Sequence, residues 1–235
     1  PEPSIARLSA RGDTLYVVGV RSIFRYHWDR AGGRLVFDED WRHDYAAGAR
    51  QSYGWDAVLA DDQAWFMDNG HHRYRTSMIG AGVSATPNRL IRVSLSDSAD
   101  HDAVGVSGLG GGSITNPPVF DVDRQIVVAM DSANKYLRAW RFDAGRRSLT
   151  PLWERGNFGA ASHMLLYPGS GELVTNDYDK GCEYVAVLDI VTGETRARAR
   201  IGGPMQGVVF PSPGWGRDFY WCSMGLVARV AVREA

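Results

Sequence analysis

The sequence predicts an all-β protein built from a repeated unit of four antiparallel strands. Short apolar or alternating runs, bounded by Gly, Asp, Asn and Pro, recur along all 235 residues. Glycine is abundant at 27 residues and aromatic residues make up 11% of the chain. No segment keeps an amphipathic helical period over about 12 residues. Many short strands separated by such turns are typical of sandwiches, barrels and propellers.

The spacing of the most apolar predicted strands distinguishes between these architectures. Five apolar cores stand at Leu15–Val18, Ala64–Met67, Ile126–Ala129, Leu173–Thr175 and Phe219–Trp221, so their first residues are 49, 62, 47 and 46 positions apart. A sandwich repeats single strands about every 8–12 residues and does not produce such a period. A period of about 40–50 residues is the signature of propeller blades. We therefore predict a β-propeller with about five visible blades.

Each predicted blade follows the same order of elements. A polar turn precedes every core: Gly12-Asp13, Asp61-Asp62, Asp123-Arg124, Gly169–Gly171 and Gly214–Gly216. Such turns suit tight hairpins, because Gly and Asp tolerate unusual backbone angles. A second strand follows each core, at 23–28, 90–95, 136–142, 184–188 and 226–232. In the first four copies this strand runs into an Asp and then an outer strand, such as Leu35–Phe37 or Thr195–Ile201.

The fifth copy stops short of an outer strand. We expect residues 1–235 to form a single propeller domain or a segment of a larger one, with blades at about 1–50, 51–109, 110–160, 161–203 and 204–235. An unpaired sheet edge invites association, so the open edge of the last blade is an expected contact site. The chain opens at Pro1 without a Met, which indicates either a trimmed or a processed chain. We expect it to be soluble, and exported if a signal was removed; the compartment stays open.

Composition excludes some classes of partner. Twenty-six basic residues balance 27 acidic ones, so we expect no nucleic-acid partner, which usually requires a clustered basic excess. No apolar run reaches the roughly 18 residues that span a bilayer, so we expect no membrane insertion. Cys182 and Cys222 are too few for a disulfide framework, and one bridge between them stays open; we expect two free, buried thiols.

Two family resemblances support the fold. The run Tyr184–Glu194, in which an apolar strand enters Asp189-Ile190-Val191-Thr192-Gly193-Glu194, resembles the repeat of quinoprotein-type (PQQ-like) propellers. The Trp that the family places a few residues later is absent, as is the adjacent Cys-Cys pair associated with quinone binding. The resemblance thus implies the fold and gives no support for PQQ. The stretch Asn116–Asn134 is similar to blades of gluconolactonase-like calcium-dependent hydrolases.

Polar residues stand at the start of the innermost strands. With the strands of a blade named A to D from the centre outward, Asp56, Asn116, His163 and Gln206 each precede an apolar A strand. If the repeat holds, these four side chains converge at the mouth of the channel, where they could bind a cation, a small polar ligand or ordered water. The B–C loops add Asp68, Asp131 and Asp177, although Asp and Asn also favour hairpin loops for conformational reasons alone.

Blade 2 carries the extra length of the chain at residues 71–87, on the side of these loops. Long loops are uncommon unless functional or disordered. We expect a lid or a protein-partner contact here, with Arg73 and Arg75 as candidate contacts to an anionic ligand.

Two classes of function remain open, and the sequence does not decide whether the chain is an enzyme. It contains no Gly-x-Ser-x-Gly, His-Glu-x-x-His or phosphate-loop motif. The first class is a propeller that binds a small ligand or a protein partner at its channel face. The second, implied by the lactonase resemblance, is a calcium-dependent hydrolase in which Asp56, Asn116 and Asp177 hold Ca²⁺ and His163 is the general base.

Overall fold

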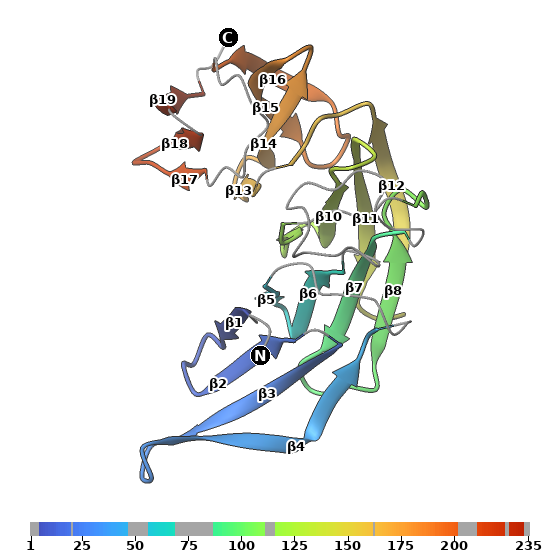
Figure 1. Ribbon diagram of the computed structural model, residues 1–235, viewed down its shortest axis with the longest axis vertical. Coiled ribbons are helices and arrows are strands. Elements are labelled where there is room, and N and C mark those ends of the chain that lie inside the picture. Colours follow the sequence, from blue (N-terminus) through green and yellow to red (C-terminus); the bar gives the residue numbers. More distant parts are fainter. Residues whose placement is uncertain are drawn as a thin grey trace. The chain divides into compact units, whose positions relative to one another are not determined.

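The computed structural model confirms the all-β prediction (Figure 1). It describes residues 5–19, 21–46, 56–68, 87–110, 116–161, 163–201, 211–223 and 226–232. Every regular element in this part of the chain is a strand. The strands form four four-stranded antiparallel sheets and one three-stranded sheet, so within the described residues the fifth blade has no outer strand, as predicted.

The strands of each sheet follow one another in chain order, as blades require. Blade 1 holds β1 (Ile5–Leu8), β2 (Thr14–Val18), β3 (Ser22–Asp29) and β4 (Arg34–Asp44), and blade 2 holds β5 (Val58–Ala60), β6 (Gln63–Met67), β7 (Arg89–Ser94) and β8 (His101–Gly105). Blade 3 holds β9 (Val119–Asp121), β10 (Ile126–Asp131), β11 (Tyr136–Asp143) and β12 (Ser148–Gly156). Blade 4 holds β13 (Leu165–Tyr167), β14 (Glu172–Asp179), β15 (Cys182–Asp189) and β16 (Thr195–Arg200), and blade 5 holds β17 (Ser212–Pro213), β18 (Asp218–Ser223) and β19 (Leu226–Ala231).

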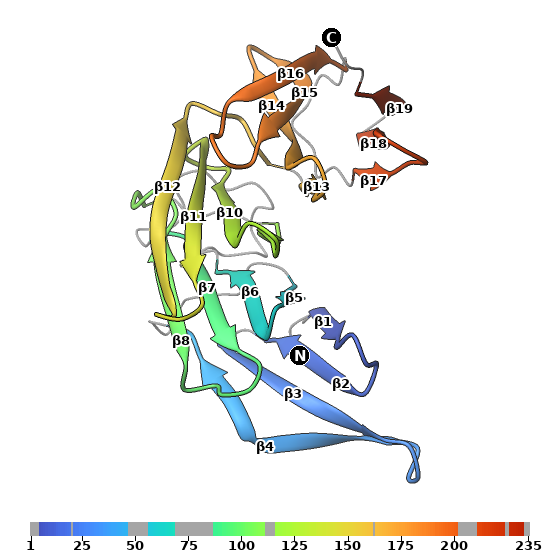
Figure 2. The same ribbon diagram turned by 180° about the vertical axis from the view of Figure 1, so that it is seen from behind.

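The chain divides into two compact units, Pro1–Pro118 and Val119–Ala235. Unit 1 contains blades 1 and 2, and unit 2 contains blades 3 to 5. Within each unit, successive sheets lie side by side in both views (Figures 1 and 2).

One backbone hydrogen bond recurs in every blade. An N–H group at or next to the end of the third strand donates to the carbonyl of the last residue in the A–B turn, at 2.8–3.0 Å. The five pairs are Trp28–Asp13, Leu95–Asp62, Phe142–Gln125, Ile190–Gly171 and Val232–Arg217. We call this the closing hydrogen bond. It ties the end of strand C to the turn between strands A and B, so these three strands are held together at the A–B end of the blade. It also identifies equivalent positions in all five blades.

In blades 2, 3 and 4, turn residues with positive φ bring the two groups of this bond together. Asp61, Asp62, Gln125 and Gly171 all have positive φ, from 52° to 66°. Gly adopts this region freely and Asp adopts it more readily than most residues. The polar turns that the sequence shows are therefore required by hairpin geometry, and they need no functional explanation.

In unit 1, one apolar cluster joins the two blades. Tyr16, Ile23 and Trp41 of blade 1 pack with Phe66 and Ile91 of blade 2, and all five are at most 5% exposed. Two side chains of blade 1 also donate hydrogen bonds across the interface. Trp41 Nε1 donates to Ser94 O at 3.1 Å, and Arg25 Nη1 donates to Leu95 O at 2.8 Å.

In unit 2, the same arrangement recurs twice. The clusters that join blade 3 to blade 4 and blade 4 to blade 5 have interiors of 0–4% exposed side chains. Trp153 of blade 3 repeats the role of Trp41, because its Nε1 donates to Ile190 O of blade 4 at 2.8 Å. Its indole ring lies so close to Gly193 that a Cβ there would stand 2.5 Å from a ring atom.

Two further observations concern the surface. In the described part of the chain, no helix is long and apolar enough to cross a bilayer. Both cysteines are free as predicted, but the prediction that they are buried is wrong, since Cys222 is exposed and Cys182 is partly exposed. The strand alternation that buries Trp221 turns Cys222 to the opposite face of β18.

Gly193→Ala should lower the free energy of unfolding by about 2–4 kcal/mol, measured by urea denaturation. The variant combines strain at φ +73° with a clash against the Trp153 ring. Gly181→Ala is the matched control, because its φ is +75° with nothing within 4 Å of the added Cβ, and it should cost about 1 kcal/mol. Equal losses in both variants would show that the Trp153 contact contributes nothing.

Two histidines meet between the outer strands of unit 1. The rings of His43 on β4 and His101 on β8 lie 3.9 Å apart, centroid to centroid. Burial and the neighbouring His101 lower the pKa of His43 from 6.5 to about 4. The folded state thus favours the neutral ring, and the unfolded state binds more protons between these two values. Stability contributed by His43 is complete above pH 6.5 and is lost as the pH falls toward 4.

We expect the melting temperature to fall between pH 6.5 and 4 by an amount that corresponds to about 1–2 kcal/mol, after allowing for solvent screening at this half-buried site. His43→Gln should flatten the profile in that window. Asp38 provides an internal reference: burial opposes its ionisation, but hydrogen bonds from Arg25 and His27 outweigh burial and lower the pKa to about 2. Its contribution is lost only at lower pH, so an unchanged slope above pH 4 in His43→Gln would contradict the assignment.

Candidate functional site

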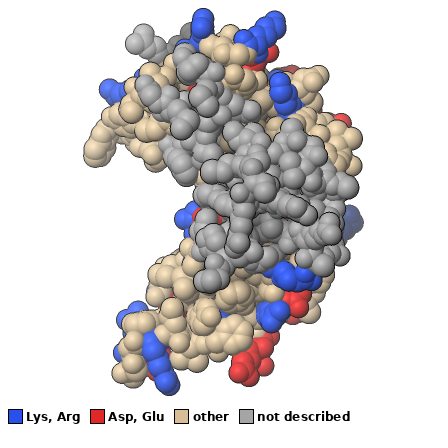
Figure 3. Space-filling view, viewed as in Figure 1, with Lys and Arg blue, Asp and Glu red and all other residues tan. Residues whose placement is uncertain are grey.

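At the A–B end of the sheets, buried carboxylates are paired with guanidinium groups. Glu172 is 2% exposed and accepts hydrogen bonds from Arg217 Nε at 3.2 Å and from Ser170 Oγ at 2.8 Å. Burial alone would raise the pKa of Glu172, but these hydrogen bonds outweigh it and the pKa lies below its usual range. Asp218 likewise accepts from Arg229 Nε at 2.6 Å. On the described surface seen in Figure 3, basic and acidic side chains lie in small groups.

The B–C loops and the starts of the A strands lie at the opposite end of the sheets. In blade 2 this end contains both a buried ion pair and buried polar atoms without partners among the described residues. Asp68 is fully buried after β6, and Arg89 Nε donates to its Oδ2 at 2.7 Å while the Arg89 backbone N–H donates to Oδ1 at 3.0 Å. Arg89 Nη2 also donates to Tyr45 O of blade 1 at 2.8 Å. Asp68 is thus a structural residue whose oxygens are already engaged.

Beside this pair lie two buried side chains with unmatched polar atoms. Asn88 is 0% exposed, and neither its Oδ1 nor its Nδ2 has a hydrogen-bond partner among the described residues. Asp56 is 3% exposed; it forms an ion pair with Arg7 through Oδ2, while Oδ1 has no partner in the described part of the chain. A buried polar atom without a partner costs about 1–3 kcal/mol. Such atoms are therefore candidates for contact with a ligand.

Strand register brings these residues to the same end of the sheet. Asp56 stands two residues before Val58, which pairs with Trp65, and Asp68 stands three residues after Trp65. Asp68 N in turn donates to Arg89 O at 3.0 Å, which places Asn88 beyond the last pair of β6 and β7. We call Asp56 and Asn88 the polar edge of blade 2.

In the corresponding loops of unit 2, the polar side chains form hydrogen bonds and ion pairs within the protein. Asp177 Oδ1 accepts from Gly159 N at 2.9 Å, and its Oδ2 lies 2.9 Å from Arg198 Nη2. Asn176 is also fully buried, and its Oδ1 accepts from Ala161 N at 2.8 Å. Asp131 is held by its neighbour Asn134, whose Nδ2 donates to Oδ2 at 2.8 Å. These groups stabilise the loops that carry them.

The residues predicted to converge are divided between the two units. Asp56 and Asn116, which is 4% exposed, belong to unit 1, whereas partly buried His163 and Asp177 belong to unit 2. Their convergence at a channel mouth stays a prediction. Gln206, Arg73 and Arg75 lie outside the described residues, as does all but Pro87 of the lid predicted at residues 71–87.

Sequence reasoning missed Asn88 and Arg89. Asn88 directly follows Pro87 at the end of the long segment, so it looks like one more polar loop residue before a strand. Only the register of β6 and β7 shows that its side chain is buried. Among the described residues, no group of three His, Cys, Asp or Glu side chains is arranged to hold a metal ion.

Solved structures of similar shape identify the fold as a β-propeller. A luciferin-regenerating enzyme matches with a TM-score of 0.58 and 14% identity over 96% of this chain and 71% of that chain. The calcium-binding protein regucalcin from Agrobacterium tumefaciens matches with a TM-score of 0.52 and 15% identity over 87% of this chain and 61% of its own. An oligogalacturonate lyase in complex with manganese matches with a TM-score of 0.52 and 15% identity, over 96% and 64%.

At these identities the similarity shows the fold alone. The chain spans 61–71% of the length of these three structures. No protein-family model matches the sequence. A search of curated proteins finds no match either.

Asn88→Leu should raise the free energy of unfolding by about 1 kcal/mol in the absence of ligand, because it replaces an unmatched buried amide by an apolar group of similar size. Asn176→Leu is the matched control. It removes the acceptor of the Ala161 N–H group and should lower the free energy of unfolding by about 1–3 kcal/mol. Urea denaturation of both variants measures the contrast, and a loss of stability in Asn88→Leu would show that its amide has a structural partner.

Proposed function

We propose that the chain is a non-catalytic binding propeller that takes a small polar ligand at the polar edge of blade 2. The observation that carries this proposal is the pair of buried side chains, Asp56 and Asn88, whose polar atoms are unmatched among the described residues. At the A–B end the buried carboxylates Glu172 and Asp218 meet guanidinium groups instead. Unmatched buried groups lower stability, and they persist in proteins mainly where function requires them.

The chemistry of the polar edge favours a neutral, hydroxylated ligand. Asn88 needs both a donor and an acceptor, and Asp56 Oδ1 needs a donor. A hydroxyl group donates and accepts, so hydroxyls at well-separated positions of a sugar or sugar lactone would satisfy all three atoms, which stand before the first and the third strand of the sheet. Arg7 already neutralises the Asp56 carboxylate through Oδ2, which reduces its attraction for a cation.

Burial favours a small molecule over a protein partner. Asp56 and Asn88 are 3% and 0% exposed, so any ligand reaches them only when the groups around them move, and a small molecule requires a much smaller movement than a folded partner does. Asn116, His163, Gln206, Arg73 and Arg75 complete the proposed set of ligand contacts.

The alternative is a calcium-dependent, lactonase-like hydrolase. In it, Ca²⁺ would polarise a substrate carbonyl when bound, Asp56, Asn116 and Asp177 would be its ligands, and His163 would accept a proton from water. The unmatched Asp56 Oδ1 suits a hard cation. Asp177 fits less well, because Gly159 N–H and Arg198 already engage both of its oxygens.

A finer family assignment, to quinoprotein-type repeats, is also a proposal. It is supported by the packing of Trp153 against Gly193, the glycine of the Asp-x-x-Thr-Gly run.

Thermal unfolding with gluconolactone and with Ca²⁺ as separate probes tests the two functions. A probe at 100 times its dissociation constant stabilises the folded state by about 2.7 kcal/mol, or roughly 5–10 °C for a chain of this size. We expect gluconolactone to give such a shift and Ca²⁺ to give none. Asn88→Leu and Asp56→Asn should each abolish the gluconolactone shift.

Arg7→Gln is the matched control for Asp56→Asn, because it removes the same ion pair but leaves Asp56 Oδ1 in place. It should lower the melting temperature while retaining the gluconolactone shift. A Ca²⁺ shift that disappears in Asp56→Asn and Asn116→Ala, with lactone hydrolysis that disappears in His163→Asn, would replace the binding proposal by the hydrolase.

A further inference from the structure

The outer strand of blade 4 has an open edge. β16 is the outermost strand of its sheet (Figure 2), and all six of its residues are exposed. Among the described residues, no strand pairs with β16 on the side away from β15. The backbone N–H and C=O groups on such an edge can pair with another chain.

Strand register shows which backbone groups of β16 point outward. Ile201 N donates to Glu183 O at 3.1 Å, so these two residues form a hydrogen-bonded pair at the end of the ladder between β15 and β16. In an antiparallel ladder, such pairs alternate with pairs whose backbone groups point away from each other. Arg200 and Arg198 stand one and three residues before Ile201 in this ladder. Their N–H and C=O groups therefore point away from β15.

The side chains of these two residues make the edge cationic. Arg198 and Arg200 are two residues apart, so both lie on the face of the sheet that carries Tyr184, whose ring centre is 3.6 Å from the Arg198 guanidinium. Arg198 forms an ion pair with Asp177. Arg200 has no carboxylate partner in the described part of the chain, and its Nε donates to Cys182 Sγ at 2.8 Å. A guanidinium has five N–H donors, so both arginines retain donors for a further anion.

The other three outer strands do not combine these features. β8 has five residues and no arginine, β12 contains Pro151, which has no N–H group to donate, and β4 contains Asp38, Glu39, Asp40 and Asp44. Among the four outer strands, only β16 has three arginines and no acidic residue. Charge of one sign discourages an edge from pairing with apolar or like-charged strands. An acidic strand is the partner that this charge still admits.

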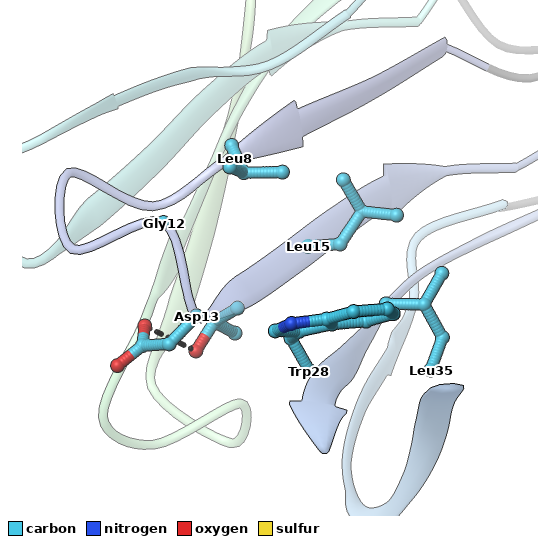
Figure 4. Close-up of a pocket in the computed structure, with 7 residues that line it drawn as sticks. Leu8, Gly12, Asp13, Leu15, Trp28 and Leu35 are labelled. Atoms are coloured by element: carbon cyan, nitrogen blue, oxygen red, sulfur yellow. Dashed lines mark hydrogen bonds between the residues drawn. The ribbon is translucent and has the colours of Figure 1, made fainter. Parts of the chain in front are cut away.

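The apolar pocket on blade 1 gives no comparable indication of a partner. Leu8, Leu15, Trp28 and Leu35 supply the apolar lining of a pocket of about 280 Å³ (Figure 4). Hydrophobic contact is not directional, so this lining does not specify an occupant. At β16, in contrast, backbone groups and charge both restrict the partner.

We propose that an extended acidic segment of a partner protein pairs with β16 and adds to blade 4 as a fifth strand. Its main chain bonds to the outward N–H and C=O groups of Arg198 and Arg200. Glu or Asp side chains at alternate positions of the segment lie opposite the two guanidinium groups. Both strands repeat every two residues, so one register satisfies both charges.

Backbone geometry favours a protein segment over a nucleic acid at this edge. A peptide strand offers donors and acceptors at the spacing of those on β16, whereas a phosphate backbone offers acceptors only. The residues of β16 other than arginine are Thr195, Ala197 and Ala199. None of them has an aromatic ring on which a base could stack.

Fluorescence anisotropy with the whole chain and a labelled peptide of four Val-Glu repeats tests the proposal. We expect saturable binding that weakens with added salt, because salt screens exposed charges. Arg200→Glu should weaken binding by about tenfold, since it replaces an attraction by a repulsion. Arg34→Glu is the matched control, because Arg34 also lies on an outer strand, β4, and its side chain is 73% exposed. This variant should bind the peptide like the original chain.

Amide hydrogen exchange followed by NMR tests strand addition directly. The N–H groups of Arg198 and Arg200 point outward in the free chain, so peptide binding should slow their exchange by about tenfold or more. The N–H group of Ala199 points toward β15 and should change less, so it serves as an internal reference.

A Val-Glu peptide that does not bind at millimolar concentration would overturn the proposal. Binding that leaves the exchange of the Arg198 and Arg200 N–H groups unchanged would exclude strand addition. Binding that Arg200→Glu does not weaken, in a variant that is folded by circular dichroism, would place the peptide elsewhere. Displacement of the peptide by an equal concentration of a thymidine oligonucleotide would indicate a nucleic-acid surface in its place.

Discussion

The packing of one apolar sheet face on the next is the interaction on which the rest of this protein depends. A blade has apolar residues on both faces, so no blade can bury its own core. Trp221 and Phe219 show the effect: they lie in a three-stranded sheet, yet both are 0% exposed because blade 4 covers them. Complete burial of such a side chain stabilises the fold by about 2–3 kcal/mol. Hydrogen bonds from Trp41 and Trp153 then fix the position of one sheet relative to its neighbour.

The two ends of the sheets differ in how their buried polar groups are paired. At the A–B end, Glu172 and Asp218 meet Arg217 and Arg229, and the turns close each blade. At the B–C end, Asp68 has a guanidinium partner, but Asn88 next to it has no polar partner among the described residues. Selection for stability alone would favour an apolar residue over such an amide. The contrast is the physical reason for placing a ligand at this end.

Most of the fold could be predicted from the sequence, because turn chemistry and strand alternation are local signals. The polar turn before Leu15 and the apolar run after it need no knowledge of the rest of the chain. The site was predicted only in part. Asp56 stands out as a polar residue before an apolar A strand, but Asn88 depends on the register of β6 and β7, which no local pattern records. The expectation of a buried Cys222 failed because alternation along β18 turns Trp221 toward blade 4 and Cys222 to the opposite face, and a sequence pattern does not say which face of a strand is covered.

The closing hydrogen bond makes the first three strands of a blade a self-contained building block. The outer strand is attached to this block from outside, and in blade 4 all six residues of β16 are exposed. In blade 4 an outer strand could therefore be exchanged with little effect on the buried faces, whereas the outer strands of blades 1 and 3 contribute Trp41 and Trp153 to them. In evolutionary terms, a natural breakpoint for duplicating or recombining this repeat lies after the third strand, and blades joined there would fit their neighbours where the new outer strand supplies such a tryptophan.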